Sequence, residues 1–464
     1  MQAEQQPNRW LVVVGAILIQ FSLGAIYAWS VFTPALEAEG WSKLDTQVVF
    51  AVGLVTFAVV MVGAGRALKA LGPRKLAILG GLTLGSGYAL AGLLGGTDFW
   101  AVCIGVGLIG GAGIGLGYVV PIAVGMAWFP DKKGMVTGLA VAGFGFGAMA
   151  WVKLAGAWGG LIEHHGLAAT FLTYGGAFAL MVLVGSVWMR NPPKGWLPAG
   201  FQPTAPAAAK GSENFTVSEM FRTPQFYLVF ATFAVSAGGG LMSIGLMKLY
   251  PMEALQAAGL DIVEASAIAG TAMAVFFSIA NGVGRIAWGS ISDLIGRRRS
   301  IIVMTVTQAI ILFFFTRMAG NEYLLYLGAV LIGFNFGGNF ALFPALTADL
   351  FGNSRVGPNY PFVFLSYGVG GIAGPILGGR LGDLGDFPMA FSICAIACLF
   401  GAVCMLLVRR ADHAEAIRPA SVHGFLHQMH LDHLEDVIEH AAHPDHFQRV
   451  VDNGKHGDAG RSAE

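Results

Sequence analysis

One arginine stands out among the residues that could do chemistry, because it lies inside an otherwise apolar stretch. Arg285 follows Asn281 in the run Phe276–Trp288 and comes eight residues before Asp293. Eight helical residues rise about 12 Å, which places the guanidinium deep in a membrane core ~30 Å thick. An arginine at that depth costs at least ~2.5–3.5 kcal/mol, and such residues usually lie on substrate pathways. The planar guanidinium can take a carboxylate with two parallel hydrogen bonds, whereas the structural alternative is pairing with backbone carbonyls or snorkelling toward the surface.

The acidic residues offer Arg285 no partner at the same depth. Asp349 falls at the end of an expected helix, Asp293 falls in a loop, and no Asp or Glu falls deep inside an expected span. A bound anion is therefore the natural counter-ion of the guanidinium. A proton, if one moves, has no carboxylate relay here, so it would travel with the bound anion or through a group that the sequence does not identify.

The composition is that of a protein surrounded by lipid. Of the 464 residues, 55% are hydrophobic and 12% are charged, and the mean hydropathy is +0.66. A soluble domain carries about 25% charged residues, so we exclude a soluble enzyme. The formal net charge of zero gives no indication of a nucleic-acid partner. The four cysteines lie in apolar stretches without metal-ligand spacing, so we expect no disulfide, no metal site and no cofactor: Cys103, Cys394, Cys398 and Cys404.

Twelve apolar segments are long enough to cross a membrane, which takes ~20 helical residues. Charged or turn residues separate them. The sequence therefore predicts an all-α membrane protein with twelve transmembrane helices. The segments lie near 10–34, 47–68, 76–95, 99–127, 134–157, 168–189, 226–248, 265–288, 300–318, 323–348, 359–379 and 387–408.

Lysine and arginine gather in the connections that follow the even-numbered segments. Lys132 and Lys133 follow the fourth segment, and the run 297–299 of three arginines follows the eighth. The opposite connections hold few basic residues, of which Lys43 is one. Basic loops stay on the cytoplasmic side. We therefore expect a multi-pass protein of the inner (cytoplasmic) membrane with both termini in the cytoplasm.

A stretch rich in Pro, Gly and Ala separates two halves of six segments each. It spans 190–225 and has the composition of a linker, here cytoplasmic. It divides the chain into a first half, 1–189, a second half, 226–410, and a tail, 411–464, which holds nine of the 11 histidines. The tail histidines could bind zinc or sense pH, but a solvated tail of low order explains them more simply.

Two loops at equivalent places of the halves repeat one pattern, which indicates duplication. The first loop lies between the second and third segments, and the other between the eighth and ninth. The matching positions, in order, are Gly65, Lys69, Gly72 and Arg74 in the first loop, and Gly289, Asp293, Gly296 and Arg298 in the second.

In these loops the chain resembles the major facilitator superfamily, whose loops carry Gly-x-x-x-Asp-x-x-Gly-Arg-Arg. The second copy is intact, whereas the first has Lys69 in place of the aspartate, which leaves the gating role of that loop open. The resemblance implies a substrate site near mid-membrane between two halves that rock around it. It also implies these gating residues: Gly65, Arg74, Gly289, Asp293 and Arg297.

Three further stretches resemble the oxalate/formate antiporter family and its bacterial monocarboxylate-transporter relatives. This resemblance implies an anion-binding arginine in helix 8, which is Arg285 here. It puts Asn281 where eukaryotic monocarboxylate transporters carry an acidic residue. The stretches are Gly24–Phe32, Gly115–Pro121 with Trp128–Gly134, and Gly138–Gly147.

The walls of the implied cavity come from helices 1, 4, 7 and 10 of such a fold. A tyrosine there offers an apolar wall and a hydroxyl donor. For each wall residue alone, packing between helices explains its presence as well as substrate contact does, and Phe144 favours packing. The candidates beside Arg285 and Asn281 are Tyr27, Tyr118, Phe144, Asn335, Phe336, Asn339 and Tyr367.

These observations predict secondary active transport of a small monocarboxylate such as lactate, pyruvate or formate. Proton symport and anion exchange both fit, with one chain as the transport unit. The alternative is oxalate/formate-type dicarboxylate exchange. Oxalate exchangers of the resembling family carry a lysine in helix 11 where Tyr367 stands here, so this site holds one positive charge and matches a monoanion. A third hypothesis is a transporter-like sensor whose histidine-rich tail reports on substrate or pH.

Overall fold

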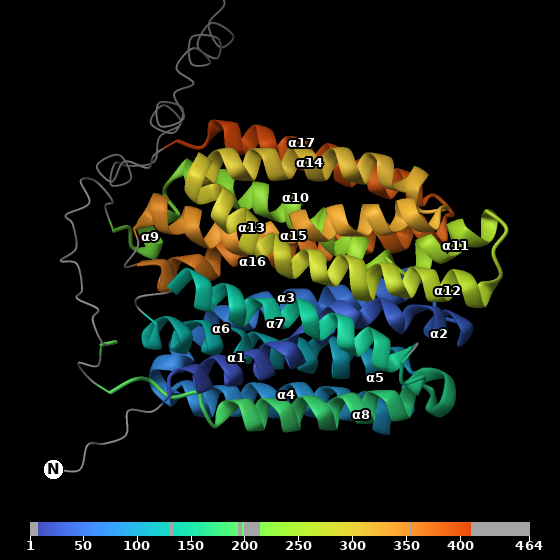
Figure 1. Cartoon of the computed structure of the whole chain (residues 1–464), viewed down its shortest axis with the longest axis horizontal. Helices are drawn as coiled ribbons and strands as arrows, with labels where there is room; N and C mark the ends of the chain where they lie inside the picture. The colour runs from blue at the N-terminus through green and yellow to red at the C-terminus, as the bar shows by residue number, and fades with distance from the viewer. Residues whose placement is uncertain are drawn as a thin grey trace, which may run out of the picture.

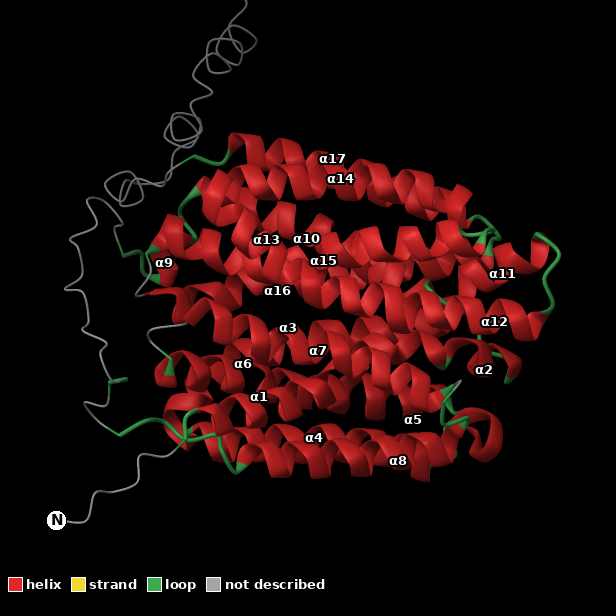
Figure 2. Cartoon of the chain, in the orientation of Figure 1, coloured by secondary structure: helices red, strands yellow, loops and turns green. Residues whose placement is uncertain are grey.

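The computed structural model describes residues 8–129, 133–156, 158–193, 197–198, 214–352 and 355–409. Helices make up nearly all of these ranges, and no strand occurs in them (Figure 2). The predicted all-α class is confirmed. The histidine-rich tail and half of the 190–225 linker lie outside the described residues.

The first half contains eight numbered helices, some of which continue one into the next. The long helix at the start is α1 followed by the tighter segment η1, and the fourth crossing consists of α5, the π-helical segment η2 and α6. The bounds are α1 Trp10–Leu23, η1 Gly24–Val31, α2 Thr33–Ala38, α3 Lys43–Leu71, α4 Pro73–Leu93, α5 Phe99–Val102, η2 Cys103–Gly110, α6 Gly111–Trp128, α7 Lys133–Ala155 and α8 Leu161–Ser186.

The second half follows the same plan. Its second crossing, which is the eighth of the chain, consists of α12, the π-helical segment η3 and α13 in series. The bounds are α9 Val217–Met220, α10 Pro224–Leu246, α11 Leu249–Ala257, α12 Ile262–Thr271, η3 Ala272–Phe277, α13 Ser278–Ile295, α14 Arg297–Met318, α15 Glu322–Phe351, α16 Val356–Asp383 and α17 Phe387–Leu407.

Eleven helical stretches of the described chain are long and apolar enough to cross a membrane. The twelfth crossing is α7, whose apolar part, Leu139–Ala155, is shorter.

Three crossings differ most from those that the apolar runs predicted. The eighth continues past its predicted end at 288 to Ile295, because the helix is ended only by Gly296 with its φ of 90°, so Asp293 lies on α13 and not in a loop. Helix α8 begins at Leu161 and bends at Gly166, where φ is 76°, and the seventh crossing breaks at residues 247–248 before α11 continues it.

The helices form two bundles that lie side by side (Figure 1): α1–α8 in blue to green, and α10–α17 in yellow-green to red. The bundles meet where α3 packs on α16 and where α7 packs on α13. Glycine permits the first approach, since a Cβ at Gly371 would lie 2.7 Å from the Leu54 Cβ. Small residues allow such contact between membrane helices. These two seams therefore hold the halves together.

Both ends of the described chain lie at one end of the bundle (Figure 1), which we call the proximal end; the distal end carries α2, α11 and the start of α12. The duplicated loops are both proximal. In each, a glycine with positive φ ends one helix and begins the next: Gly72 has φ 76° and Gly296 has φ 90°. The repeat is thus present in the backbone as well as in the sequence.

Candidate functional site

Arg285 is buried in α13, with 4% of its surface exposed. Its Nε donates a hydrogen bond to the Asn281 Oδ1 at 3.0 Å, one helical turn earlier. The two terminal nitrogens of the guanidinium are also buried, and neither has a hydrogen-bond partner among the described residues. The Asn281 Nδ2 is likewise buried and unbonded there. Two adjacent side chains thus present unused donors to the same interior region.

Aromatic side chains from both halves surround this guanidinium. Its Cζ lies 4.2 Å from the Phe340 ring centroid and 5.9 Å from that of Phe144. Both are cation–π contacts. The rings touch one another in a continuous cluster, the aromatic cage, and all but Phe340 are buried. It consists of Tyr27, Phe57, Tyr118 and Phe144 from the first half, and Phe336, Phe340, Phe364 and Tyr367 from the second.

Two tyrosines join the halves inside the cage. The hydroxyls of Tyr27 and Tyr367 lie 3.0 Å apart and share one hydrogen bond. The hydroxyls of Tyr27 and Tyr118 lie close enough to Arg285 to interact with its charge, although neither makes a hydrogen bond of good geometry with its terminal nitrogens. Tyrosine hydroxyls can both donate and accept, so they suit a site that holds an anion beside a cation.

Irregular helix and close glycine contacts set these side chains in place. Tyr27 lies in η1, and a side chain at Gly24 in that segment would collide with the Phe144 carbonyl. Arg285 follows η3, a π-helical turn of a kind often found at functional sites. Gly337 lets α15 pack directly on the backbone of α13. A Cβ at position 337 would lie 3.2 Å from the backbone nitrogen of Arg285.

The structure brings most of the sequence candidates together around Arg285, but it places two of them elsewhere. The Asn335 amide donates to the Thr307 hydroxyl on α14 at 3.1 Å. The Asn339 oxygen accepts from Ser236 on α10 at 2.8 Å. Each α-helical residue is rotated ~100° from the next, so the neighbours of Phe336 and Phe340 face other helices.

Sequence reasoning missed Phe57, Phe340 and Phe364. Phe340 follows Phe336 by four positions and Phe364 precedes Tyr367 by three, so each shares a helix face with a candidate. That spacing was an available signal. Phe57 had none, because nothing in the sequence indicated that this face of α3 meets α16.

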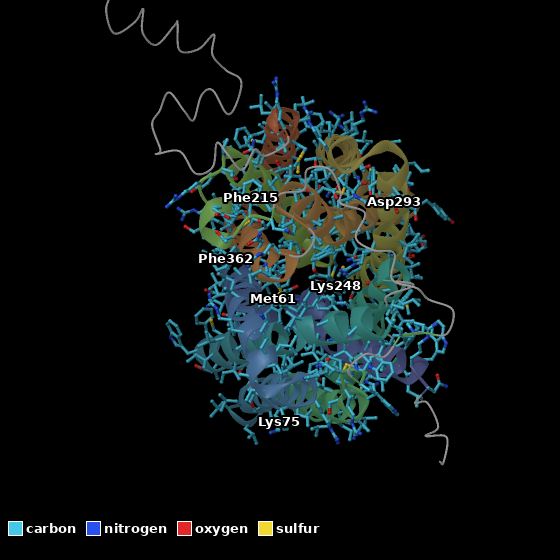
Figure 3. All side chains as sticks on the ribbon, turned by 90° about the vertical axis from the view of Figure 1, so that its left-hand side faces the viewer. Met61, Lys75, Phe215, Lys248, Asp293 and Phe362 are labelled. Carbon is cyan, nitrogen blue, oxygen red and sulfur yellow. The ribbon has the colours of Figure 1, made fainter. Side chains whose placement is uncertain are left out.

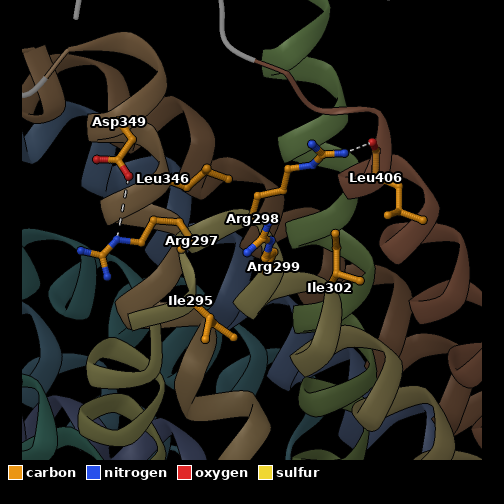
Figure 4. A pocket seen from close by; sticks show the side chains of 9 residues that line it. Ile295, Arg297, Arg298, Arg299, Ile302, Leu346, Asp349 and Leu406 are labelled. Carbon is orange, nitrogen blue, oxygen red and sulfur yellow. Dashed lines mark hydrogen bonds and ion pairs between the residues drawn. The ribbon is translucent and has the colours of Figure 1, made fainter. Parts of the chain in front are cut away.

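The two predicted gating loops differ in their charges. At the second, Arg297 pairs with Asp293 at 2.5 Å and reaches Asp349 at 3.9 Å; it also contacts Ser292 and donates to the Gly289 carbonyl at 3.3 Å. Arg297 and Asp349 border a cavity of about 510 Å³ that Arg298 and Arg299 also line (Figure 4).

At the first loop, Arg74 is exposed and has no ion pair among the described residues, and the surroundings of Gly65 are open. Among the described residues, therefore, only the second copy forms a charge cluster.

Lys43 joins the two halves at the distal end. Its ammonium lies 2.8 Å from Glu253 on α11 and 3.8 Å from Glu37. The backbone N–H groups of Lys43 and Leu44 donate to the two carboxylate oxygens of Asp383 at 2.7 and 3.0 Å. Burial, and then the charges of Glu253 and Asp383, raise the pKa of Glu37 above its usual value, although Lys43 opposes this. This distal clamp ties α2 and α3 of the first half to α11 and α16 of the second.

An axial view shows how the two halves lie relative to each other. Figure 3 looks along the bundle from the proximal end, with the second half above and the first below, and places Met61 and Lys248 near the boundary between them. Within the described residues, no group of three or more His, Cys, Asp or Glu could hold a metal ion. The chemistry available in the centre is therefore that of one guanidinium, one amide and several phenols.

Comparison with known proteins gives the same family along nearly the whole chain. The model of the Major Facilitator Superfamily matches residues 12–276 and 259–438. An uncharacterized MFS-type transporter, YhjX of Escherichia coli (strain K12), is 30% identical over 79% of this chain and 87% of its own length. The oxalate:formate antiporter of Oxalobacter formigenes is 27% identical over 84% of this chain and 88% of its own length. The apicoplast pyruvate carrier 1 of Toxoplasma gondii is 25% identical over 78% of this chain and 82% of its own length.

Proposed function

Because the chain belongs to the major facilitator superfamily, and is thus a multi-pass membrane transporter, we propose that it carries a small monocarboxylate across the inner membrane by alternating access. Lactate, pyruvate and formate are the substrates that fit, and Arg285 binds the carboxylate. One chain is the transport unit.

The observation that carries this proposal is the unpaired guanidinium. A buried donor without a partner costs about 1–3 kcal/mol, and more when it is charged. Both terminal nitrogens of Arg285 are in that state among the described residues. A carboxylate would supply two acceptors in the plane of the fork and the missing negative charge. The tyrosines of the cage would hydrogen-bond it, and the rings of Phe340 and Phe144 would close around its small organic part.

Charge counting favours a monoanion. Arg285 is the cation of the cage, and position 367 holds a tyrosine whose hydroxyl already bonds to Tyr27. A dianion would leave one charge uncompensated in a buried site, at a cost of several kcal/mol. A relative in Toxoplasma bears the name of a pyruvate carrier, and pyruvate is a monoanion.

Proton symport and anion exchange both agree with this site. No carboxylate lies beside Arg285 among the described residues, so any proton would move with the substrate or through a group other than a carboxylate at this site. We place both termini and the linker in the cytoplasm from the lysine and arginine distribution. The distal clamp then faces the periplasm, and breaking its contacts opens the site to that side.

The test is uptake by the purified protein in liposomes. Labelled lactate, pyruvate, formate and oxalate are each supplied with and without a pH gradient, and with and without an internal carboxylate. We expect saturable uptake of the monocarboxylates and weak competition by oxalate. A requirement for the pH gradient indicates symport, and a requirement for internal substrate indicates exchange. Equal uptake of oxalate and lactate contradicts the charge-counting argument.

Oxalate/formate-type exchange remains the second candidate, because an antiporter of that substrate pair is 27% identical over most of both chains. The variant Tyr367→Lys tests how far the two sites differ. A second cation should weaken monocarboxylate uptake and let oxalate compete. Unchanged selectivity would mean that residue 367 does not set the charge of the substrate.

A further inference from the structure

The side-chain amide of Asn281 has one bonded and one unbonded polar atom, and the side chain is fully buried. Its Oδ1 accepts a hydrogen bond from the Arg285 Nε at 3.0 Å. An arginine nitrogen can only donate, so the amide oxygen has to face the guanidinium and the amide nitrogen is left for another partner. The Asn281 Nδ2 is therefore a donor whose orientation is fixed by Arg285.

No side chain of the described residues accepts a hydrogen bond from the Asn281 Nδ2. Other polar groups of the region already have partners. The Ser278 hydroxyl on the same helix donates to the Met273 carbonyl at 3.0 Å, and the hydroxyls of Tyr27 and Tyr367 bond to each other. Burial of an amide N–H without an acceptor is unfavourable. The missing acceptor then belongs to a molecule that enters the site.

The guanidinium and the amide together offer more donors than a carboxylate uses. Both terminal nitrogens of Arg285 are buried and have no partner among the described residues, and the two oxygens of one carboxylate match them. The Asn281 Nδ2 is a third nitrogen beside this fork, because the same amide holds the Nε. A ligand that satisfies all three nitrogens carries a third acceptor close to its carboxylate. An oxygen on carbon 2 of the acid has that position.

We propose that Asn281 selects substrates with an oxygen on carbon 2, so that the protein carries 2-hydroxy and 2-oxo monocarboxylates in preference to other short acids. Arg285 binds the carboxylate, and the Asn281 Nδ2 donates to the oxygen on carbon 2. Hydroxyl and carbonyl oxygens both accept, so lactate and pyruvate both fit. Propionate and formate lack this acceptor and leave the amide nitrogen unpaired. The role of Asn281 rests on the proposed function and narrows its substrate class.

Uptake by the unaltered protein in liposomes gives the first test. Lactate, pyruvate, propionate and 3-hydroxypropionate are compared, because the last has the atoms of lactate with the hydroxyl on carbon 3. A site that hydrogen-bonds a substrate oxygen rejects the analogue that lacks it. We expect kcat/KM for lactate and pyruvate to exceed that for the other two acids at least about tenfold, the equivalent of ~1.4 kcal/mol. Equal values for lactate and either of the other two acids overturn the proposal.

The variant Asn281→Leu removes the amide at similar volume. It also removes the acceptor of the Arg285 Nε, which affects every carboxylate alike, so the readout is the ratio of kcat/KM for lactate to that for propionate. We expect this ratio to fall about tenfold, toward one. Asn335→Leu is the matched control, because that buried amide bonds to Thr307 on α14, and it should keep the wild-type ratio. An unchanged ratio in a folded Asn281→Leu protein overturns the proposal.

Binding in detergent separates the failure of this role from the failure of the proposed function. Lactate should raise the Tm of the wild-type protein more than propionate does, whereas the two acids should act alike on Asn281→Leu. If that variant does not insert, the four acids on the wild-type protein decide alone. If propionate is bound and carried as well as lactate, the proposed function stands and the role of Asn281 fails. If none of the acids is bound or carried, both fail.

Discussion

The two halves of this protein share one plan but contribute different chemistry to the centre. The first half supplies four aromatic rings of the cage and no charge; the second supplies four rings, Asn281 and the guanidinium of Arg285. Duplication set the scaffold, as the matching glycines Gly72 and Gly296 show. If an anion binds between two halves that move apart, only one half needs to carry the cation. The other has to close the site against water.

The same asymmetry appears in the proximal loops. The second loop holds the cluster of Asp293, Arg297 and Asp349, whereas the first has Lys69 where the aspartate would stand. Two basic residues, Lys69 and Arg74, cannot form the corresponding ion pair. The loops are alike in backbone and unlike in electrostatics.

Removing the guanidinium of Arg285 should abolish transport, because the cage would then have no cation from either half to bind the carboxylate. We expect Arg285→Ala to lower uptake at least about a hundredfold while the protein still inserts, since losing a charge-assisted, bidentate contact costs ~3 kcal/mol or more. Arg285→Lys should restore little, because a point charge cannot form the fork. Uptake at equal expression in liposomes measures both. Wild-type uptake by Arg285→Ala would remove the basis of the proposed site.

Shortening a ring that contacts the guanidinium should have a smaller effect. Phe340→Leu removes the contact at 4.2 Å, which is worth about 0.5–2 kcal/mol, so we expect KM to rise about 3- to 30-fold. The matched control is Phe343→Leu, because Phe343 stacks on Phe233 at 4.2 Å within the second half. That control should lower thermal stability without a comparable rise in KM. Similar KM values for the two variants would mean that the cage acts only through packing.

Neutralising one residue in each loop compares the halves directly. Asp293→Asn breaks the pair with Arg297 and should slow turnover about fivefold, the equivalent of ~1 kcal/mol for a partly exposed pair in a cluster. Lys69→Asn at the matching place should leave turnover unchanged. Initial rates of uptake under saturating substrate test this. Equal slowing by both variants would show that the two loops act alike despite their charges.

The smallest effect concerns the distal clamp and pH. The pKa of Glu37 is raised in the folded state, chiefly by burial, so folding favours its protonated form, and the folded state loses stability as pH rises through that pKa. Glu37→Gln should therefore raise Tm slightly at neutral pH, by the equivalent of less than ~1 kcal/mol of stability at this partly exposed site. The gain should vanish as pH falls below the pKa of Glu37. Glu39→Gln, a nearby exposed position, should change nothing; a lower Tm in Glu37→Gln at neutral pH would contradict the sign.

The sequence alone determined the features that depend on composition and on position along one helix. Apolar runs of sufficient length predicted the helical crossings, and α7 completes the set of twelve. The place of Arg285 inside one run predicted a buried guanidinium, which the structure describes with 4% exposure. The loop signature indicated the family that the comparison gives. These inferences succeed because the membrane sets the length of a helix and the cost of a charge, whatever the neighbouring helices are.

Only the tertiary structure decided which helix faces meet. Asn335 and Phe336 are neighbours in the sequence, yet one bonds to Thr307 on α14 and the other contacts Tyr27 across the halves. Phe57 joined the cage, and Lys153 came to donate a hydrogen bond to Thr271 on α12, without any sequence signal for either contact. A helix surrounded by apolar groups on all sides has no strong periodicity to fix its rotation, because lipid and protein neighbours are equally apolar. Rotation is then set by close packing at glycines such as Gly24 and Gly337, against partners that lie far away in the chain.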